Sequence, residues 1–438
     1  MAENQTGTDA GNRVSRLAKF TAEKFKKFDE VQRGARDDWG HDSVKVVYHK
    51  ENFSNFLMGR LNEVVPITFE AWPSLSCDAR CPLCTYSINN ARSEDDKHPS
   101  LTFARTDLFT ETMQKLASGG VRSITLTGGG EPLLNPEFGN LIKHINLAGM
   151  KWGMFTHGLH LKGQIRDAIL TYPPKFLRVS LNSSSPETHA KEYRMGLQAY
   201  EDVLQNILDF ARLARGLPIS LGVGYAVDPK TTDDELLDIA RCLRHLRDES
   251  EGRVNYASFR PKVVYYNRDG SPRYTQVRHD EFAELPSRIK ECMANILGDI
   301  IASGIRLDIK HHQFHNITDR RVFTNGRALS WVSQIDHLGR GFLLSELNGS
   351  PWPGATYGSF ADGTRFEDTW YSSRRLELTE RYQRQELKLP LNLKTAHVDY
   401  LLDEIAERFG QFNEEQVKEF WCRPEIQRLS SPRNWDFL

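Results

Sequence analysis

The stretch Ser76–Tyr86 reads Ser-Cys-Asp-Ala-Arg-Cys-Pro-Leu-Cys-Thr-Tyr and carries three closely spaced cysteines. Cys77, Cys81 and Cys84 have the spacing C-x3-C-x2-C, and a loop this short lets their sulfur atoms converge on a single metal centre. Soft thiolate ligands of this kind bind iron–sulfur clusters, zinc or Cu(I). The stretch therefore predicts a metal site carried on one loop.

The number of cysteines available as ligands distinguishes between these metals. A structural zinc site takes four protein ligands, but the next cysteine after Cys84 is Cys242. Three thiolates on a cubane [4Fe–4S] cluster would leave one iron open to react. The spacing thus favours a cluster with an open iron, and a zinc-binding protein without catalytic function is the alternative.

A second motif follows downstream at Ile124–Pro132, which reads Ile-Thr-Leu-Thr-Gly-Gly-Gly-Glu-Pro. It is an apolar strand that runs into three glycines, an acid and a proline. Glycines let the backbone approach a ligand closely, and Glu131 can accept a hydrogen bond from an ammonium group. The motif predicts a ligand-binding turn at the end of a strand.

Six apolar segments between residues 65 and 262 read as strands and alternate with segments of helical periodicity. This alternation predicts an α/β domain with a parallel sheet and right-handed crossovers. Active sites in such sheets lie at the carboxyl ends of the strands, and both motifs follow strands. The predicted strands are Val65–Ala71, Arg122–Thr127, Lys151–Thr156, Phe176–Leu181, Ile219–Val227 and Val254–Phe259.

Together the two motifs resemble those of the radical S-adenosylmethionine (SAM) enzymes. The resemblance implies a partial (β/α)6 TIM-like barrel, one [4Fe–4S] cluster held by Cys77, Cys81 and Cys84, and SAM as a second cofactor. It also implies that Leu83 packs near the adenine of SAM. The glycine motif is implied to hold the amino group of the methionine part of SAM, through Gly128, Gly129, Gly130 and Glu131.

Polar residues at later strand ends are implied to contact SAM as well. Thr156 ends the third strand in Thr-His-Gly, where the family often has Thr-Asn-Gly, so His157 departs from the pattern. Ser180 and Asn182 match the position that contacts the ribose hydroxyls. Arg194 could pair with the SAM carboxylate through two hydrogen bonds. A structural role for His157 and a surface salt bridge for Arg194 are the simpler alternatives.

The fifth and sixth predicted strands carry further candidates. Gly222 and Gly224 would leave room for adenine against the backbone, with simple strand packing as the alternative. Arg260 is expected to point into the mouth of the barrel, where it would bind an anionic or hydroxylated substrate.

The chain divides into three predicted parts. Residues 1–64 form an N-terminal extension, with residues 1 to about 13 disordered and an amphipathic helix over Val14–Arg36. Residues 65–262 form the barrel, and residues 263–438 form an α+β region that covers the substrate. In that region we expect a helix over His279–Ser303, a strand over Ile305–Ile309, a hairpin over Gln334–Glu346 with Gly339 and Gly341 at its turn, and helices over Phe366–Arg375 and Leu401–Phe409.

Composition excludes some classes of partner. The chain has 438 residues, with 57 Lys and Arg against 58 Asp and Glu, so its net charge is −1. This balance argues against nucleic acid, because binding the phosphate backbone needs a basic excess. The sequence has no apolar run of the about 20 residues that span a bilayer, and its six cysteines are too few for a disulfide framework. We therefore expect a cytoplasmic protein without a membrane helix.

The resemblance implies a reaction that starts with one electron from a reduced flavodoxin or ferredoxin. SAM is cleaved at the open iron, and the 5′-deoxyadenosyl radical takes a hydrogen atom from an unactivated C–H bond. The protein positions the reactants and excludes water. Three fates of the substrate radical are open: oxidation, redox-neutral elimination or rearrangement, and quenching by a hydrogen donor of the protein.

Two features bear on that fate. Cys292 and Cys422 fall in the region expected to cover the site, so either could donate hydrogen in an epimerisation, although buried cysteine is common simply as a small apolar residue. Oxidation in the family often uses an auxiliary cluster, and residues 335–370 resemble a degenerate, cysteine-free form of the SPASM/twitch-like extension that binds it. Ser330 and Ser345 stand near the expected cysteine positions, which disfavours oxidation.

Two substrate classes remain open at this point. The first is a small polyhydroxylated molecule, such as a sugar, aminocyclitol or nucleoside, altered in a biosynthetic pathway by dehydration, epimerisation or dehydrogenation. The second is a ribosomally made peptide, altered by epimerisation or backbone chemistry. The single predicted cluster and the polar C-terminal region favour the first class slightly.

Overall fold

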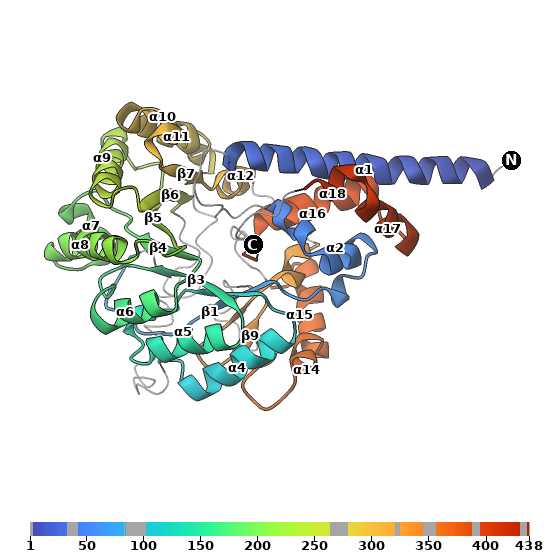
Figure 1. The fold of residues 1–438 in the computed structure, drawn as a ribbon, viewed down its shortest axis with the longest axis horizontal. Coiled ribbons are helices and arrows are strands. Elements are labelled where there is room, and N and C mark those ends of the chain that lie inside the picture. Colours follow the sequence, from blue (N-terminus) through green and yellow to red (C-terminus); the bar gives the residue numbers. More distant parts are fainter. Residues whose placement is uncertain are drawn as a thin grey trace.

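A computed structural model of the chain describes residues 3–32, 43–82, 84, 102–262, 279–319, 325–344, 356–387, 395–429 and 436–437. Its centre is one sheet of ten strands, with helices packed along the outer face of the sheet (Figure 1). Helices from the two ends of the chain gather on the other side (Figure 1). The predicted α/β class is confirmed.

The sheet contains the six predicted strands and extends beyond them at both edges. Its order is β10-β9-β8-β1-β2-β3-β4-β5-β6-β7. β7 (Arg306–Ile309) adds a parallel strand next to β6, and β8 (Val332–Ile335) adds one next to β1. The sheet therefore continues past residue 262, where we expected the barrel to end. The predicted strands are β1 (Thr68–Ala71), β2 (Ser123–Leu126), β3 (Lys151–Thr156), β4 (Phe176–Ser180), β5 (Ser220–Val227) and β6 (Val254–Pro261).

Amphipathic helices connect these strands and bury their apolar stripes against the sheet. On α8, Val203, Ile207 and Phe210 recur at helical spacing and belong to the main core. Thr232 caps the start of α9 through reciprocal hydrogen bonds with Glu235. The helices of this layer are α4 (Thr106–Ser118), α5 (Phe138–Leu147), α6 (Gly163–Thr171), α7 (Pro186–Tyr193), α8 (Gln198–Leu213), α9 (Asp233–Glu249) and α10 (Leu285–Leu297).

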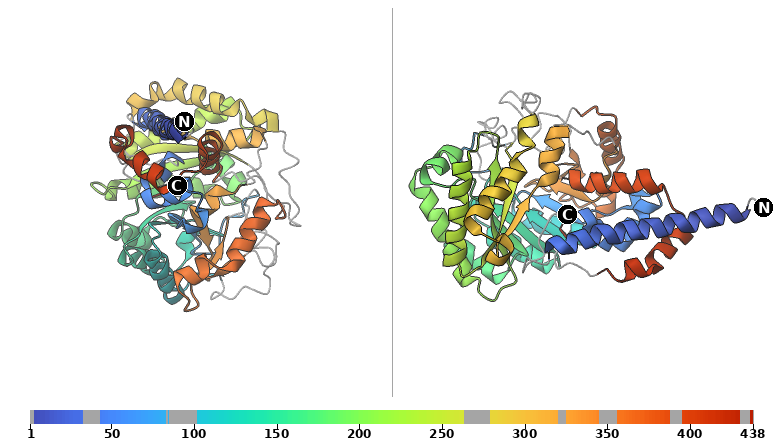
Figure 2. Two further views of the ribbon diagram at one scale, coloured as in Figure 1. Left: turned by 90° about the vertical axis from the view of Figure 1, so that its right-hand side faces the viewer. Right: turned by 90° about the horizontal axis from the view of Figure 1, so that it is seen from above.

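The two ends of the chain share a second core. Phe20 packs on Phe409 and Phe53 on Phe420, with ring centroids 5.5 Å and 5.9 Å apart. The first part of α1 extends away from the other helices (Figures 1 and 2). Among the described residues, no helix is long and apolar enough to cross a bilayer. The helices of this unit are α1 (Glu3–Gln32), α2 (Lys50–Leu57), α16 (Ala396–Phe409), α17 (Glu414–Cys422) and α18 (Pro424–Gln427).

The C-terminal hairpin is confirmed, with one difference at its turn. β8 pairs antiparallel with β9 (Arg340–Phe342), and Gly339 takes the left-handed φ of 75° that the turn requires. Gly341 lies within β9 rather than in the turn. The other short elements are β10 (Thr356–Ser359), α11 (Ile300–Ser303), α12 (His311–Asp319), η1 (Ser43–Tyr48), η2 (Leu61–Glu63), η4 (Pro132–Leu134), η6 (His279–Phe282) and η7 (Arg327–Ser330).

Three predicted helix boundaries are wrong for identifiable reasons. α1 begins at Glu3, so residues 3–13, which we expected to be disordered, are helical. The predicted helix over His279–Ser303 is interrupted by the proline at the start of α10 and by Gly298, which ends α10 with a φ of 65°. The predicted helix over Phe366–Arg375 divides in two, because the Ser372 side chain caps a new helix. The two pieces are α14 (Phe366–Trp370) and α15 (Ser373–Gln383).

The inner face of the sheet begins with an apolar floor near the strand starts. Phe176 on β4 and Tyr256 on β6 form a small cluster with Phe437. Two hydrogen bonds fix the neighbouring Asp436 at the starts of β1 and β2. Its carbonyl oxygen accepts from the hydroxyls of Thr68 and Ser123. Asp436 and Phe437 thus cover the end of the sheet opposite the cysteine loop.

This floor should contribute measurably to stability. Phe437 is 1% exposed, and its ring centroid lies 5.3 Å from that of Phe176. Phe437→Ala should lower the free energy of unfolding by about 3 kcal/mol, because it removes a buried aromatic ring and leaves a cavity. Leu147→Ala on α5 is the control, because Leu147 is 69% exposed. Thermal unfolding followed by circular dichroism compares the variants, and equal midpoints would contradict the role of Phe437.

Candidate functional site

The cysteine loop follows β1 and is anchored by segments distant in sequence. The Arg80 N–H donates to the Tyr193 carbonyl oxygen at 2.9 Å, and the Leu75 N–H donates to the Thr102 carbonyl oxygen at 2.7 Å. The thiols of the loop are free of disulfides and half-buried. The loop is therefore fixed at the carboxyl end of the sheet, where the sequence predicted the site.

The three thiols lie close enough to affect one another. Burial, and then the neighbouring Cys84 and Cys77, raise the pKa of the Cys81 thiol to about 12. Three thiolates at this place would therefore need a bound cation to balance their charge. This donor set fits an iron–sulfur cluster, whose ligands are cysteine thiolates.

The backbone of the glycine motif lies directly against the cysteine loop. The Gly130 N–H donates to the Ser74 carbonyl oxygen at 3.0 Å, and the Glu131 N–H donates to the Ser76 carbonyl oxygen at 2.8 Å. These two bonds join the ends of β1 and β2 immediately before Cys77.

Only glycine permits this approach. A Cβ atom on Gly130 would lie 2.1 Å from the Ser76 carbonyl oxygen, and one on Gly128 would lie 1.7 Å from the Gly130 carbonyl oxygen. A Cβ atom on Gly129 would lie 2.8 Å from the ring of Trp72. All three glycines are therefore required by close packing at the strand end.

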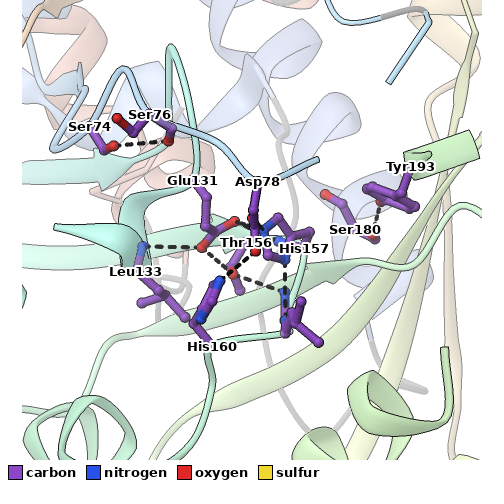
Figure 3. A network of polar contacts seen from close by, with 12 residues as sticks. Ser74, Ser76, Asp78, Glu131, Leu133, Thr156, His157, His160, Ser180 and Tyr193 are labelled. Atoms are coloured by element: carbon purple, nitrogen blue, oxygen red, sulfur yellow. Dashed lines mark hydrogen bonds and ion pairs between the residues drawn. The ribbon is translucent and has the colours of Figure 1, made fainter. Parts of the chain in front are cut away.

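The Glu131 carboxylate is held in one orientation. It is 2% exposed, and Oε1 accepts hydrogen bonds from the Thr156 hydroxyl at 2.5 Å and from the Leu133 N–H at 3.1 Å. Oε2 accepts from the His157 N–H at 2.9 Å (Figure 3). Thr156, predicted to contact SAM, thus positions Glu131 in this structure. A fixed, buried carboxylate is suited to binding an ammonium group.

Asp78 forms a clamp that the sequence did not predict. Its Oδ1 lies 2.8 Å from His157 Nε2, and its Oδ2 lies 2.7 Å from His160 Nε2 (Figure 3). Burial would raise the pKa of Asp78, but the hydrogen bonds from both histidines hold it well below its usual value. Burial would lower the pKa of His157, but the charge of Glu131 and the bond to Asp78 raise it well above its usual value. The clamp ties the cysteine loop to the end of β3.

One mixed group of possible metal ligands overlaps this clamp. Within the described residues, the sulfur of Cys77, an oxygen of Asp78 and a nitrogen of His157 lie within 4.8 Å of one another. Such ligands suit zinc, but both ring nitrogens of His157 already have protein partners: Nε2 lies 2.8 Å from Asp78 Oδ1, and Nδ1 accepts from the Leu159 N–H at 3.2 Å. The three thiols fit a cluster better than this group fits zinc.

The residues predicted to contact ribose come together at the end of β4. Asn182 has a left-handed φ of 50°, and its Oδ1 accepts from the Ala226 N–H at 2.8 Å. Its Nδ2 donates to the Tyr193 hydroxyl at 2.9 Å. That hydroxyl donates in turn to the Ser180 carbonyl oxygen, as Figure 3 shows. The Asn182 side chain therefore has two protein partners.

Arg194 and Arg260 lie at the carboxyl ends of their elements. Arg194 follows α7, is exposed and has a left-handed φ of 54°. Arg260 is exposed near the end of β6. Leu83 and Ser345 lie outside the described residues, and Ser330 is 7% exposed in η7.

The glycines of β5 make room for protein side chains. A Cβ atom on Gly222 would lie 2.5 Å from the ring of Tyr256, and one on Gly224 would lie 3.2 Å from the Arg178 side chain. Both positions are occupied on the inner face by neighbouring strands. Strand packing, the simpler of the two predicted roles, accounts for these glycines.

Neither predicted hydrogen donor is brought to the cysteine loop. Cys292 is buried in the core of the outer helix layer, on α10, which lies beside α9 (Figure 1). Cys422 is exposed on α17, in the helical unit formed by the chain ends. The expectation that the C-terminal region would place one of these thiols over the site is therefore wrong. Cys242 lies on α9, and its sulfur accepts a hydrogen bond from the Tyr200 hydroxyl at 3.4 Å.

Sequence reasoning missed three residues of the site. Asp78 and His160 carried a usable signal, because Asp78 follows the first cysteine directly and His160 lies three residues after His157. Tyr193 carried none, because α7, which places it, was not predicted.

Comparison with known proteins agrees with this arrangement. Residues 73–243 match the sequence model of the family described as the Radical SAM superfamily. The chain is 27% identical over 231 residues to a dTDP-4-amino-4,6-dideoxy-D-glucose ammonia-lyase of Streptomyces venezuelae, covering 51% of this chain and 44% of the relative. It is 33% identical over 101 residues to an S-adenosylmethionine-dependent nucleotide dehydratase of Flammeovirga pacifica, covering 23% and 33%. The chain thus spans less than half of either relative.

A solved structure shares the fold. SuiB of Streptococcus suis, bound to S-adenosylmethionine, superposes with a TM-score of 0.53 and 11% identity over 86% of this chain and 78% of that chain. At this identity the likeness concerns the fold alone.

The clamp predicts how firmly iron is held. Asp78→Ala should weaken iron binding by about 10- to 100-fold, the usual cost of losing a group that orients metal ligands. The rate of iron loss to a chelator, after anaerobic reconstitution, measures the change. Asp167→Ala on α6 is the control, because its side chain is 62% exposed and pairs with Arg166 beside it. Equal rates for Asp78→Ala and the unaltered protein would rule the clamp out.

Proposed function

We propose a reaction for this chain, which belongs to the radical SAM superfamily and uses a [4Fe–4S] cluster and SAM as cofactors. In this proposal the enzyme removes a hydrogen atom from the sugar part of a nucleotide or nucleotide-linked sugar, and the product forms by loss of water or ammonia. The observation that carries it is the meeting of the cysteine loop, the glycine motif and the buried Glu131 at one end of the sheet.

The two curated relatives support the substrate class. One is named for an amino sugar carried by dTDP, and the other for a nucleotide. Both names describe eliminations, one of ammonia and one of water. The shared element is a sugar that carries phosphate, which is the polyhydroxylated class favoured by the sequence.

The residues of the site have separate roles in this proposal. Cys77, Cys81 and Cys84 would hold the cluster, and Glu131 would bind the amino group of SAM. Ser180, at the end of β4, would contact its ribose. When bound and reduced by flavodoxin or ferredoxin, the cofactors supply a radical able to take hydrogen from a C–H bond. The protein then has to hold the sugar in place and keep water out.

The positions of the thiols favour elimination over epimerisation. An epimerase of this kind would need a donor to return hydrogen to the sugar, but Cys292 and Cys422 lie in the outer helix layer and the terminal helical unit. In an elimination the substrate radical loses water or ammonia, and the product radical that remains would be quenched by one electron from the reduced flavodoxin or ferredoxin and one proton from water. No thiol of the protein is needed for this step.

The substrate class can be tested by isotope transfer. The reconstituted enzyme is incubated anaerobically with SAM, a reductant and nucleotide-linked sugars or nucleotides that carry deuterium on the sugar carbons. Mass spectrometry should find deuterium in 5′-deoxyadenosine, and Cys81→Ala should form no 5′-deoxyadenosine, because the cluster would lose a ligand. Cleavage of SAM with deuterium arriving only from a peptide substrate would overturn the proposal in favour of the peptide class.

A further inference from the structure

A layer of charged residues lies between the apolar floor and the strand ends. Arg178 is two residues after Phe176 and two before Ser180 on β4, so all three side chains face inward. The Arg178 guanidinium lies over the Phe155 ring, 3.9 Å from its centroid. Arg178 therefore lies two residues further from the carboxyl end of β4 than Ser180, the residue expected to contact the ribose of SAM.

Arg178 reaches across the glycines of β5 to the next strands. Its Nη1 donates to the Ser258 hydroxyl on β6 at 3.3 Å, and that hydroxyl donates to Asp308 on β7 at 3.3 Å. Asp308 is also paired with Lys310, with the two charged groups 2.5 Å apart. The carboxylate of Asp308 is thus already bonded to Lys310 and Ser258.

The Arg178 guanidinium has no carboxylate within ion-pair distance among the described residues, and its Nε has no hydrogen-bond partner there. Burial, and then the positive charge of Arg260, lower the pKa of Arg178 to about 10, so the group stays charged at neutral pH. A half-buried guanidinium with unused donors is costly unless an anion binds it.

The charges around Arg178 are mostly positive. Arg260, Arg306 and Lys310 lie on β6, β7 or just after β7, and each acts electrostatically on Arg178 or on Asp308. Glu70 on β1 is the other carboxylate whose charge reaches Arg178. Planar guanidinium groups with several donors match the geometry of phosphate oxygens.

We infer that the inner face of β4–β7 is the binding site for the phosphate or diphosphate group of the substrate, with Arg178 as its central ligand. This rests on the proposed function, since it assigns one part of the substrate to one part of the same site. The phosphate would lie below the SAM ribose, so the attached sugar would extend upward toward the strand ends. Arg260, at the upper end of β6, would bind the same group from the mouth.

Binding of inorganic pyrophosphate to the holoenzyme tests this directly. Titration calorimetry on the reconstituted protein with SAM present should show pyrophosphate binding that Arg178→Gln weakens by about tenfold or more, the effect of losing charged hydrogen bonds. Arg241→Gln is the matched control, because Arg241 is exposed on α9 and pairs with Asp238; it should not change the affinity. Arg178→Lys keeps the charge without the paired donors and should give an intermediate loss.

The outcomes separate this inference from the proposed function. No pyrophosphate binding by the unaltered enzyme, equal affinity in Arg178→Gln, or equally tight binding of succinate would overturn the phosphate site. Iron content and circular dichroism report whether Arg178→Gln is folded, and Arg178→Lys carries the test if it is not. Failure of the unaltered enzyme to cleave SAM would instead overturn the proposed function, whatever its affinity for pyrophosphate.

Discussion

The architecture of the site depends on the contact between two backbones. Gly130 and Glu131 donate their N–H groups to the carbonyl oxygens of Ser74 and Ser76, and no residue with a Cβ atom fits at Gly130. This contact puts a buried carboxylate beside a loop of three thiols at the joint end of β1 and β2. A carboxylate suited to an ammonium group and three thiols suited to a metal cluster thereby lie side by side. The rest of the sheet supplies what such a pair needs around it.

Along the strands the inner face changes character in three steps. The floor of Phe176, Tyr256 and Phe437 is apolar and closed by the end of the chain. The middle layer around Arg178 is charged, and the upper edge carries the polar groups of the strand ends. An apolar floor strengthens the electrostatic interactions above it, because it keeps water away from one side. A substrate with a charged end and a hydroxylated end would match this order from bottom to top.

The sequence was a good guide where one local signal sufficed. Hydrophobic periodicity predicted the six central strands, and cysteine spacing predicted the loop. Prediction from the sequence failed where the structure depends on segments that are distant in the chain. β8 pairs with β1 although the two strands are far apart in sequence, and the terminal helices share a core that no local pattern indicates. The same limit applies to the site. The clamp of Asp78 depends on where β3 ends. The position of Cys292 depends on how the outer helices pack, and that of Cys422 depends on how the two ends of the chain pack together.

The most direct test of the account is the amount of iron and sulfide bound per chain after anaerobic reconstitution, measured together with 5′-deoxyadenosine formed from SAM under a reductant. The account predicts about four irons per chain and formation of 5′-deoxyadenosine, as expected for one [4Fe–4S] cluster with an open iron. About eight irons would mean a second cluster and would favour oxidation over elimination. Bound zinc without cleavage of SAM would contradict the account altogether.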